Sequence, residues 1–199
     1  MSELTKPESN WQPRQVFLFS GHRIDEPGRP VPRFPQTKAE SAAEKIGEAL
    51  DELGAGAEDL ALAQGASGSD ILFLEACKKR RVHLQILLPF PEPTFIQKSI
   101  LTSDKGEQWR QRYYGLTSTL KPPPRILPDE LGPVLKGVDP YECCNLWLLY
   151  TALSYGIKKV QFICLWDGKK GDGPGGTAHM YEEVKERTGQ VIWIDSRKI

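Results

Sequence analysis

The sequence lacks an excess of charge of either sign, and it lacks long apolar runs. Its 26 lysines and arginines balance 26 aspartates and glutamates, so no global charge attracts the chain to nucleic acid or to an anionic membrane. No apolar run approaches the roughly 20 residues that span a bilayer, and the polar N-terminus has no apolar signal-peptide core. We therefore expect a cytoplasmic protein that contacts no membrane, and we do not expect nucleic acid as its partner.

Patterns for metal ligands are absent as well. The four cysteines, Cys77, Cys143, Cys144 and Cys164, form no CxxC pair, and the three histidines are scattered along the chain. Zinc sites in proteins use paired ligands at short spacings. The sequence therefore predicts reduced thiols, no metal site and no bound cofactor. It assigns no role to the adjacent cysteines.

The chain instead alternates short apolar runs with helical segments. Such an alternation indicates βαβ units with right-handed crossovers and a parallel sheet that is covered on both faces. We predict one α/β domain over residues 15–199, Rossmann-like and three-layered, after a disordered lead-in at residues 1–14. Its mostly parallel sheet of five to seven strands is flanked by helices. The main strands are expected within residues 15–21, 59–64, 82–90, 159–166 and 190–195, and the main helices within 37–56, 69–81, 139–156 and 178–189.

Glycine-containing turns follow three of the predicted strands. They are residues 20–23 (SGHR), 64–70 (QGASGSD) and 166–177 (WDGKKGDGPGGT). In a parallel sheet these turns meet at the carboxyl edge, and two of them lead into helices, whose N-terminal N–H groups can hold phosphate. Neither a GxGxxG nor a GxxxxGK[ST] pattern is present. We predict one glycine-lined cleft; the alternative is a set of surface turns, with Thr177 as a helix N-cap.

The second turn resembles that of a known superfamily. Gly65, Ala66, Gly68 and Asp70 match the G-A-x-G-x-D turn of the SLOG superfamily, named for the DNA-processing protein DprA and the Lonely Guy phosphoribohydrolases. The resemblance runs from about residue 15 to residue 195 and is nearest to the SLOG-like domains of bacterial signalling and defence proteins. It implies a Rossmann-like nucleotide-binding fold. Asp70 has two interpretations, a partner for the helix dipole or a ligand for a ribose hydroxyl.

The third turn resembles a phosphate-binding motif of the Lonely Guy branch. Residues 174–177 (PGGT), with Glu182 and Glu183 downstream, are similar to PGGxGTxEE, and Asn145 stands where that branch often has a polar residue. The resemblance implies a nucleotide sensor or, alternatively, a phosphoribohydrolase that cleaves the N-glycosidic bond of a nucleoside 5′-monophosphate. In the hydrolase, Glu182 and Glu183 would stabilise oxocarbenium-like charge and orient water.

This sequence departs from the hydrolase motif in two respects. The glutamate pair lies five and six residues past Thr177, about 8–9 Å along a helix at 1.5 Å per residue, whereas the motif has it directly after the threonine. The arginine expected near the start of the preceding helix is replaced by cysteine, and an arginine of the first loop, Arg23, Arg29 or Arg33, is the candidate substitute. Binding is therefore better supported than catalysis.

The favoured interpretation is a sensor or signalling domain that binds a nucleotide-derived small molecule, such as a nucleoside monophosphate, ADP-ribose or an NAD-derived signal. The hydrolase, an interaction domain without a ligand, and a homodimer stay open. If the protein is an enzyme, its predicted catalytic residues are Glu182 and Glu183. The predicted ligand-binding residues are Ser20, Gly21, His22, Arg23, Gly65, Ala66, Gly68, Asp70, Asp167, Gly173, Gly175, Gly176 and Thr177.

Overall fold

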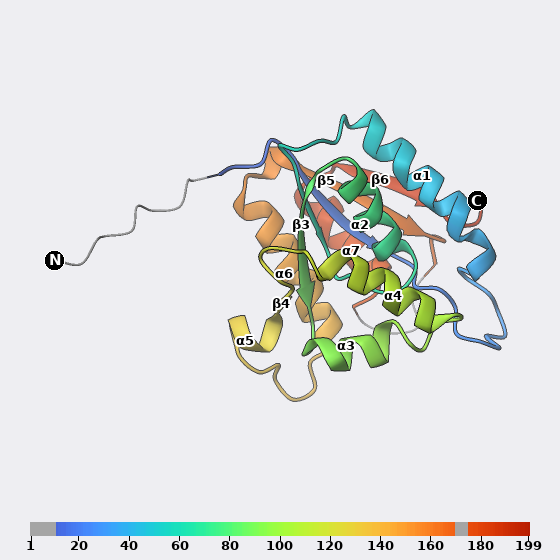
Figure 1. Ribbon diagram of the computed structural model, residues 1–199. Coiled ribbons are helices and arrows are strands. Elements are labelled where there is room, and N and C mark those ends of the chain that lie inside the picture. The colour runs from blue at the N-terminus through green and yellow to red at the C-terminus, as the bar shows by residue number, and fades with distance from the viewer. Residues whose placement is uncertain (1–10, 170–174) are drawn as a thin grey trace.

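A parallel six-stranded sheet forms the centre of the protein in a computed structural model that describes residues 11–169 and 175–199. The strands are β1 (Val16–Gly21), β2 (Leu60–Ala63), β3 (His83–Leu88), β4 (Arg125–Ile126), β5 (Val160–Trp166) and β6 (Val191–Asp195). Their order in the sheet is β4-β3-β2-β1-β5-β6, and every pair is parallel (Figure 1). The strand order reverses at β1, which lies between β2 and β5.

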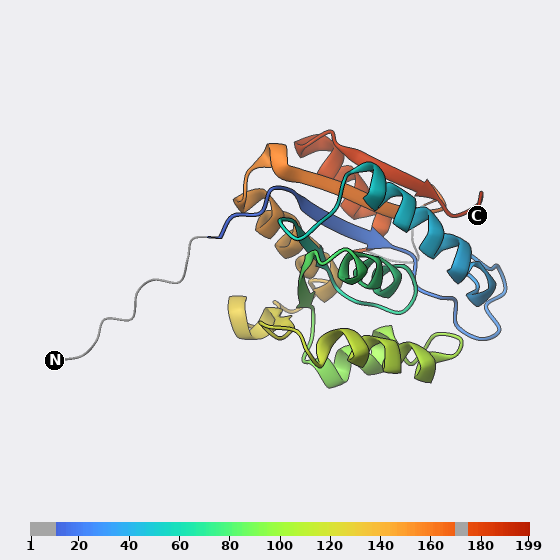
Figure 2. The ribbon, with the colours of Figure 1, turned by 45° about the horizontal axis from the view of Figure 1, so that its top comes forward.

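Helices cover both faces of this sheet (Figure 2). One face packs against α1 (Ala39–Glu52), α2 (Ser69–Lys79), α3 (Glu92–Ser99) and α4 (Gly106–Thr117). The other packs against α5 (Leu127–Leu131), α6 (Pro140–Ser154) and α7 (Thr177–Arg187). Each face thus has its own buried apolar cluster, and the sheet is the middle of three layers.

The residues of the central strand, β1, explain why both faces of the sheet are covered. Phe17 and Phe19 enter the cluster under α1 and α2, whereas Val16 and Leu18 enter the cluster under α6 and α7. All four side chains are buried. A strand that is apolar on both sides can be stable only when both faces of its sheet are covered.

The start of α6 is set by its own sequence and borders the cavity described below. Asp139 is the N-cap, and its Oδ1 accepts hydrogen bonds from the N–H groups of Tyr141 (2.9 Å) and Glu142 (3.0 Å). Pro140 occupies the first turn, where its missing N–H costs nothing. This capping fixes where the first turn of α6 lies.

The predicted α/β class, the three layers and the number of strands are confirmed, and the described pairing is parallel throughout. The first long helix lies within its expected range, residues 37–56. A 3-10 turn, Gln36–Lys38, precedes it, and α1 begins at Ala39 with no side-chain cap. In the described ranges no helix is both long and apolar enough to cross a membrane. Within the expected lead-in, the structure describes residues 11–14, where the Arg14 guanidinium lies 2.7 Å from Asp59 Oδ2.

Candidate functional site

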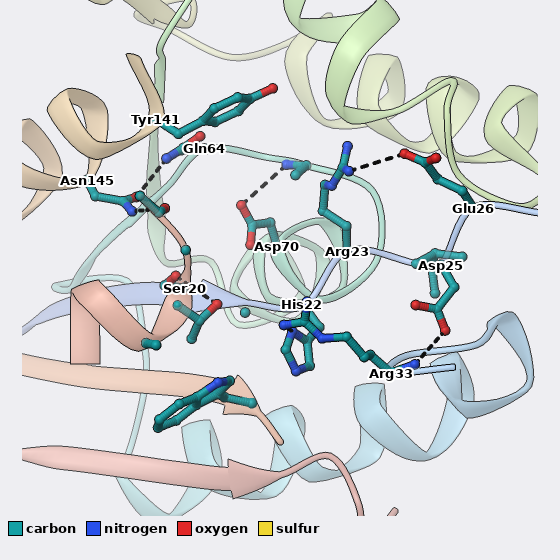
Figure 3. Close-up of a pocket in the computed structure, with 18 of the residues that line it drawn as sticks. Ser20, His22, Arg23, Asp25, Glu26, Arg33, Gln64, Asp70, Tyr141 and Asn145 are labelled. Atoms are coloured by element: carbon teal, nitrogen blue, oxygen red, sulfur yellow. Dashed lines mark hydrogen bonds and ion pairs between the residues drawn. The ribbon is translucent and has the colours of Figure 1, made fainter. Parts of the chain in front are cut away.

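A cavity of about 290 Å³ lies at the carboxyl edge of the sheet (Figure 3). The end of β1 contributes Ser20, Gly21 and His22 to its lining, and β1 is the strand at which the strand order reverses. Ligands of open parallel sheets bind outside the carboxyl ends of strands at such a reversal. The lining also includes residues of the turns that follow β2 and β5. The three glycine turns therefore converge on one cavity, as the sequence predicts.

The structure brings most of the predicted binding residues to this cavity. Gly65 and Gly68 lie in the turn behind its lining, and Asp167 contacts the lining residue His22. Gly173 lies outside the described residues. The predicted residues that line the cavity are Ser20, Gly21, His22, Arg23, Ala66, Asp70, Gly175, Gly176 and Thr177.

The turn before α2 is closed by protein groups. Asp70 Oδ2 accepts hydrogen bonds from the N–H groups of Gly65 (3.1 Å) and Ala66 (3.3 Å). The Ser69 N–H donates to the His22 carbonyl at 3.2 Å. N–H groups that are already bonded within the protein are not available to a phosphate. The N–H groups of Gly65, Ala66 and Ser69 therefore form no open cradle for a phosphate.

Packing against the first loop holds the same turn in place. Gly68 has φ +91°, and a Cβ at this position would lie 2.7 Å from the Ile24 nitrogen. The Ser67 N–H donates to the Ser99 carbonyl at 3.1 Å, which ties the turn to the end of α3. Glycine is needed here for a close approach of two backbones of the protein.

Asp70 lies in the first turn of α2, as its interpretation as a partner for the helix dipole requires, and it also lines the cavity, so the interpretation as a ribose ligand stays a prediction. Burial raises its pKa to about 7, although the backbone N–H groups of the turn favour the charged form. A carboxyl group with this pKa is partly protonated near neutral pH. It can therefore accept a hydrogen bond from a ligand or donate one.

The start of α7 differs from the start of α2. Gly176 is its N-cap, without a side-chain hydrogen bond, and its first turn contains no acidic residue. Within the described part of the chain, no backbone group accepts a hydrogen bond from the N–H of Gly176, Thr177 or Ala178. All three residues line the cavity, and the Ser20 hydroxyl lies 3.4 Å from Thr177 Oγ1. A helix start with no side-chain cap and no acidic residue in its first turn is a favourable place for an anion.

The glycine that requires a special backbone conformation in this turn is Gly175. Its φ is +76°, and a Cβ there would lie 2.5 Å from the Glu142 nitrogen at the start of α6. Gly176, by contrast, has φ −78° and ψ 176°, a conformation open to any residue. Gly175 therefore serves packing against α6, and Gly176 faces the cavity.

A chain of amide groups connects three elements around the cavity. The Gln64 Nε2 group donates to Asn145 Oδ1 at 2.8 Å, and the Asn145 Nδ2 group donates to the Gly175 carbonyl at 2.5 Å. These residues belong to the end of β2, to α6 and to the turn before α7. These hydrogen bonds hold the glycine turn that precedes α7 against the sheet.

A buried histidine lies between charged groups at the end of β1. The Asp167 N–H donates to His22 Nε2 at 3.1 Å, and Arg33 Nη2 lies 3.3 Å from His22 Nδ1. Burial, and then the positive charge of Arg33, lower the pKa of His22 to about 4. The pKa of Asp167 is lowered as well: burial opposes this, but the Lys169 N–H, His22 and Arg33 outweigh it. A neutral imidazole here connects the first loop to the end of β5.

The first loop brings charges of both signs to the cavity. Asp25 Oδ2 accepts hydrogen bonds from the N–H groups of Arg33 and Phe34, both at 2.9 Å, which folds the loop back on itself. Arg23 lies 3.6 Å from Glu26 and donates to a backbone carbonyl of α3. The cations in the lining are Arg23, Arg29, Arg33 and Lys98, which include all three arginines named as substitutes.

The predicted catalytic pair does not reach this cavity. Glu182 is exposed on α7, and neither it nor Glu183 belongs to the lining. Glu183 Oε2 lies 2.6 Å from Arg187, one turn further along the helix. The carboxylates that do line the cavity are Asp25, Glu26 and Asp70.

Sequence reasoning missed the polar residues that other elements bring to the cavity. Gln64 was detectable, because it is a polar residue at the carboxyl end of an apolar strand, as Asp167 is. Tyr141 and Lys98 carry no such signal, since only the packing of α6 and α3 places them in the lining. The Tyr141 hydroxyl lies 2.9 Å from Ser99 Oγ, which fixes the ring at the rim.

Comparisons with known proteins bear on the fold. No family model matches the sequence, and no curated protein matches it. Among solved structures the chain is similar to a protein called TM1055, with a TM-score of 0.42 and 14% identity, over 89% of this chain and 72% of that one.

Two further similar structures are of DNA processing protein A. The Helicobacter pylori protein, described with a single-stranded DNA binding mode, has a TM-score of 0.36 and 15% identity over 92% of this chain and 76% of its own. The Streptococcus pneumoniae protein has a TM-score of 0.39 and 13% identity over 94% and 60%. Likeness this distant says nothing about ligand or activity. The Rossmann-like fold is established by the parallel sheet and the helices on its two faces.

Proposed function

We propose that this protein binds a nucleotide in the cavity at the carboxyl edge of its sheet, with the phosphate at the start of α7. The observation that carries the proposal is the uncapped first turn of α7, which faces the cavity without an acidic residue. The partial positive charge of a helix N-terminus favours an anion, and the Thr177 hydroxyl adds a donor. The lining has four cations and three carboxylates, of which Asp70 is partly protonated near neutral pH, so the balance of charge favours an anion as well.

The size of the cavity favours a ligand with one nucleoside unit. Pockets for drug-sized ligands are roughly 300–1,000 Å³, and this cavity, at about 290 Å³, is at the lower end. A nucleoside monophosphate is the ligand of choice on this ground, and a dinucleotide is the weaker candidate. ADP-ribose is intermediate in size between the two, so its affinity indicates how large a ligand the cavity accepts.

Sensing is the proposed role, because neither glutamate that was predicted to be catalytic lies in the lining. Glu182 and Glu183 stay predicted catalytic residues. A binding protein needs a cavity and an anion site, whereas a hydrolase also needs a carboxylate placed to act at the glycosidic bond.

Calorimetric titration with adenosine 5′-monophosphate, adenosine, inorganic phosphate and ADP-ribose tests this proposal. The monophosphate is expected to bind at least about 10-fold more tightly than adenosine, because a charge-assisted hydrogen bond contributes about 1.5–3 kcal/mol. Equal affinity for adenosine would contradict a phosphate site.

Two controls run beside the titration. A thymidine oligonucleotide tests single-stranded DNA, the partner described for the H. pylori protein. Tighter binding of the oligonucleotide than of the monophosphate would replace the proposed ligand class. Release of free adenine in the same incubations would show turnover.

A further inference from the structure

The orientation of the Gln64 side chain is fixed by its neighbours. The Gly175 carbonyl can only accept a hydrogen bond, so the Asn145 amide must turn its NH₂ group toward it. Asn145 Oδ1 then faces Gln64, and the Gln64 NH₂ group must face Asn145. The acceptor Oε1 of Gln64 therefore lies on the side of the amide that faces away from Asn145. Exchange of the Gln64 amide oxygen and nitrogen would break the hydrogen bond to Asn145.

This oxygen has no partner among the described residues, although Gln64 is only 9% exposed and lines the cavity. Asp70 also lines the cavity, and it accepts hydrogen bonds from Gly65 and Ala66, the two residues that follow Gln64 (Figure 3). Because Gln64 lines the cavity, its Oε1 is an acceptor held in a fixed position and open to whatever occupies the cavity. The site thus matches a ligand group that donates hydrogen bonds.

The distance along the chain of amides identifies which part of a nucleotide reaches this point. Only Asn145 separates Gln64 from Gly175, which directly precedes the proposed phosphate site. In a nucleoside 5′-monophosphate the pentose is the part joined to the phosphate, and its 2′- and 3′-hydroxyls are donors. The base lies one ring further away.

We propose that Gln64 is a specificity-determining residue that accepts a hydrogen bond from a ribose hydroxyl, so that the cavity selects ribonucleotides over 2′-deoxyribonucleotides. This inference rests on the proposed function, because it takes the phosphate to lie at α7. Asp70 is the second acceptor at the same end of the cavity. The ligand then has a defined direction, with its anionic end at α7 and its hydroxyls at the turn before α2.

The test compares adenosine 5′-monophosphate with its 2′-deoxy and 3′-deoxy analogues by calorimetry, in the wild-type protein and in Gln64→Met. Methionine keeps the length of the side chain and removes the acceptor. We expect the wild-type protein to bind at least one deoxy analogue about 10-fold more weakly, which corresponds to one lost hydrogen bond. In Gln64→Met this ratio should fall close to one.

The ratio separates recognition from support of the turn. Gln64→Met also removes the bond to Asn145, so a structural role alone would weaken all three ligands equally and leave the wild-type ratio intact, which would overturn the inference. If the variant does not fold, equal affinity of the wild-type protein for all three ligands still overturns it. Binding of the three ligands without discrimination leaves the phosphate site standing, whereas no binding of any of them removes both proposals.

Discussion

The two glycine turns that lead into α2 and α7 look alike in the sequence, yet they differ in what their N–H groups contact. The turn before α2 gives its N–H groups to Asp70, to the His22 carbonyl and to the Ser99 carbonyl. The turn before α7 is followed by a first helical turn without an acidic residue, and its N-cap makes no side-chain hydrogen bond. Glycine density therefore shows where backbones approach closely, and it does not show whether the approaching group belongs to the protein or to a ligand.

The difference assigns separate roles to the two turns. The closed turn carries the acceptor end of the cavity, with Asp70 and Gln64 in the lining, and the open turn carries the donor end, with Thr177. Each turn nevertheless depends on one glycine with positive φ, Gly68 or Gly175, that packs against backbone of another segment. The predictions below test the shared feature first and then the differences.

The largest expected effect is on stability and comes from Gly68→Ala. The new Cβ would lie 2.7 Å from the Ile24 nitrogen in a backbone conformation that alanine rarely adopts. We expect a loss of about 3 kcal/mol or more in the free energy of unfolding, measured by urea denaturation. Gly28→Ala is the matched control, because Gly28 has φ +77° with nothing within 4 Å, and its loss should be about 1 kcal/mol. Equal losses in the two variants would contradict the packing role of Gly68.

The next effect is on binding and comes from Ala178→Glu, which gives α7 the acidic first turn that α2 has. A carboxylate there complements the helix dipole, so stability should be unchanged or raised by a few tenths of a kcal/mol. The same charge repels a phosphate, and we expect at least about 30-fold weaker binding of adenosine 5′-monophosphate, near 2 kcal/mol. Ala178→Gln is the uncharged control. If the glutamate and glutamine variants bind with the same affinity, the anion is not at α7.

The sequence predicts features that depend on local patterns, and it does not predict those that depend on packing between distant segments. The strands, the sheet edge and the turns are local or pattern features, and burial on both faces of β1 is written in its four apolar residues 16–19. The sequence could not separate Gly175 from Gly176, because the need for positive φ at Gly175 depends on how the turn packs against α6.

Side-chain direction is the other limit of the sequence. Glu182 and Glu183 come after the glycine turn in the sequence, which does not show where their side chains point. Met180 and Val184 of α7 are buried against the sheet, and this packing determines which face of the helix the glutamates occupy. Tyr141 reaches the lining only because α6 packs beside the turn before α7. Such contacts between distant segments have no local signal.

The third prediction concerns pH and Asp70. Folding raises the pKa of this carboxyl from 3.8 to about 7. The unfolded state therefore loses its proton first, and the stabilisation from this group declines as pH rises from about 4 to 7. Asp70→Asn removes the decline, since the amide oxygen can still accept from the turn. The variant should gain about 2 kcal/mol or more over the wild-type protein between pH 4 and pH 8.

The reference for that measurement must be the wild-type protein at each pH. Burial lowers the pKa of His22 to about 4, so the stabilisation from this residue is lost as pH falls from about 6.5 to 4. Asp70 and His22 change the free energy of unfolding in opposite directions as pH rises. A wild-type free energy of unfolding that does not vary with pH is therefore compatible with both pKa shifts. A difference curve that does not change between pH 4 and pH 8 would contradict the raised pKa of Asp70.

The smallest expected effect comes from the Thr177 hydroxyl. Thr177→Val keeps the shape of the side chain and removes one donor at the open turn, so the affinity for adenosine 5′-monophosphate should fall about 5-fold, near 1 kcal/mol. Thr188→Val, at the other end of α7, also removes a hydroxyl, which bonds to the Val184 carbonyl. That control should leave the affinity unchanged. Loss of affinity in both variants would indicate a general effect on the helix.

The most direct measurement of the central claim is a titration of isotope-labelled protein with adenosine 5′-monophosphate, observed through the backbone amide resonances of the two turns. The account predicts that the amide protons of Gly176, Thr177 and Ala178 move downfield and become protected from exchange, because they bond to the phosphate. The amide protons of Gly65 and Ala66 should keep their exchange rates, because Asp70 already holds them. Protection that appears only at Gly65 and Ala66 would place the phosphate at α2 and contradict the account.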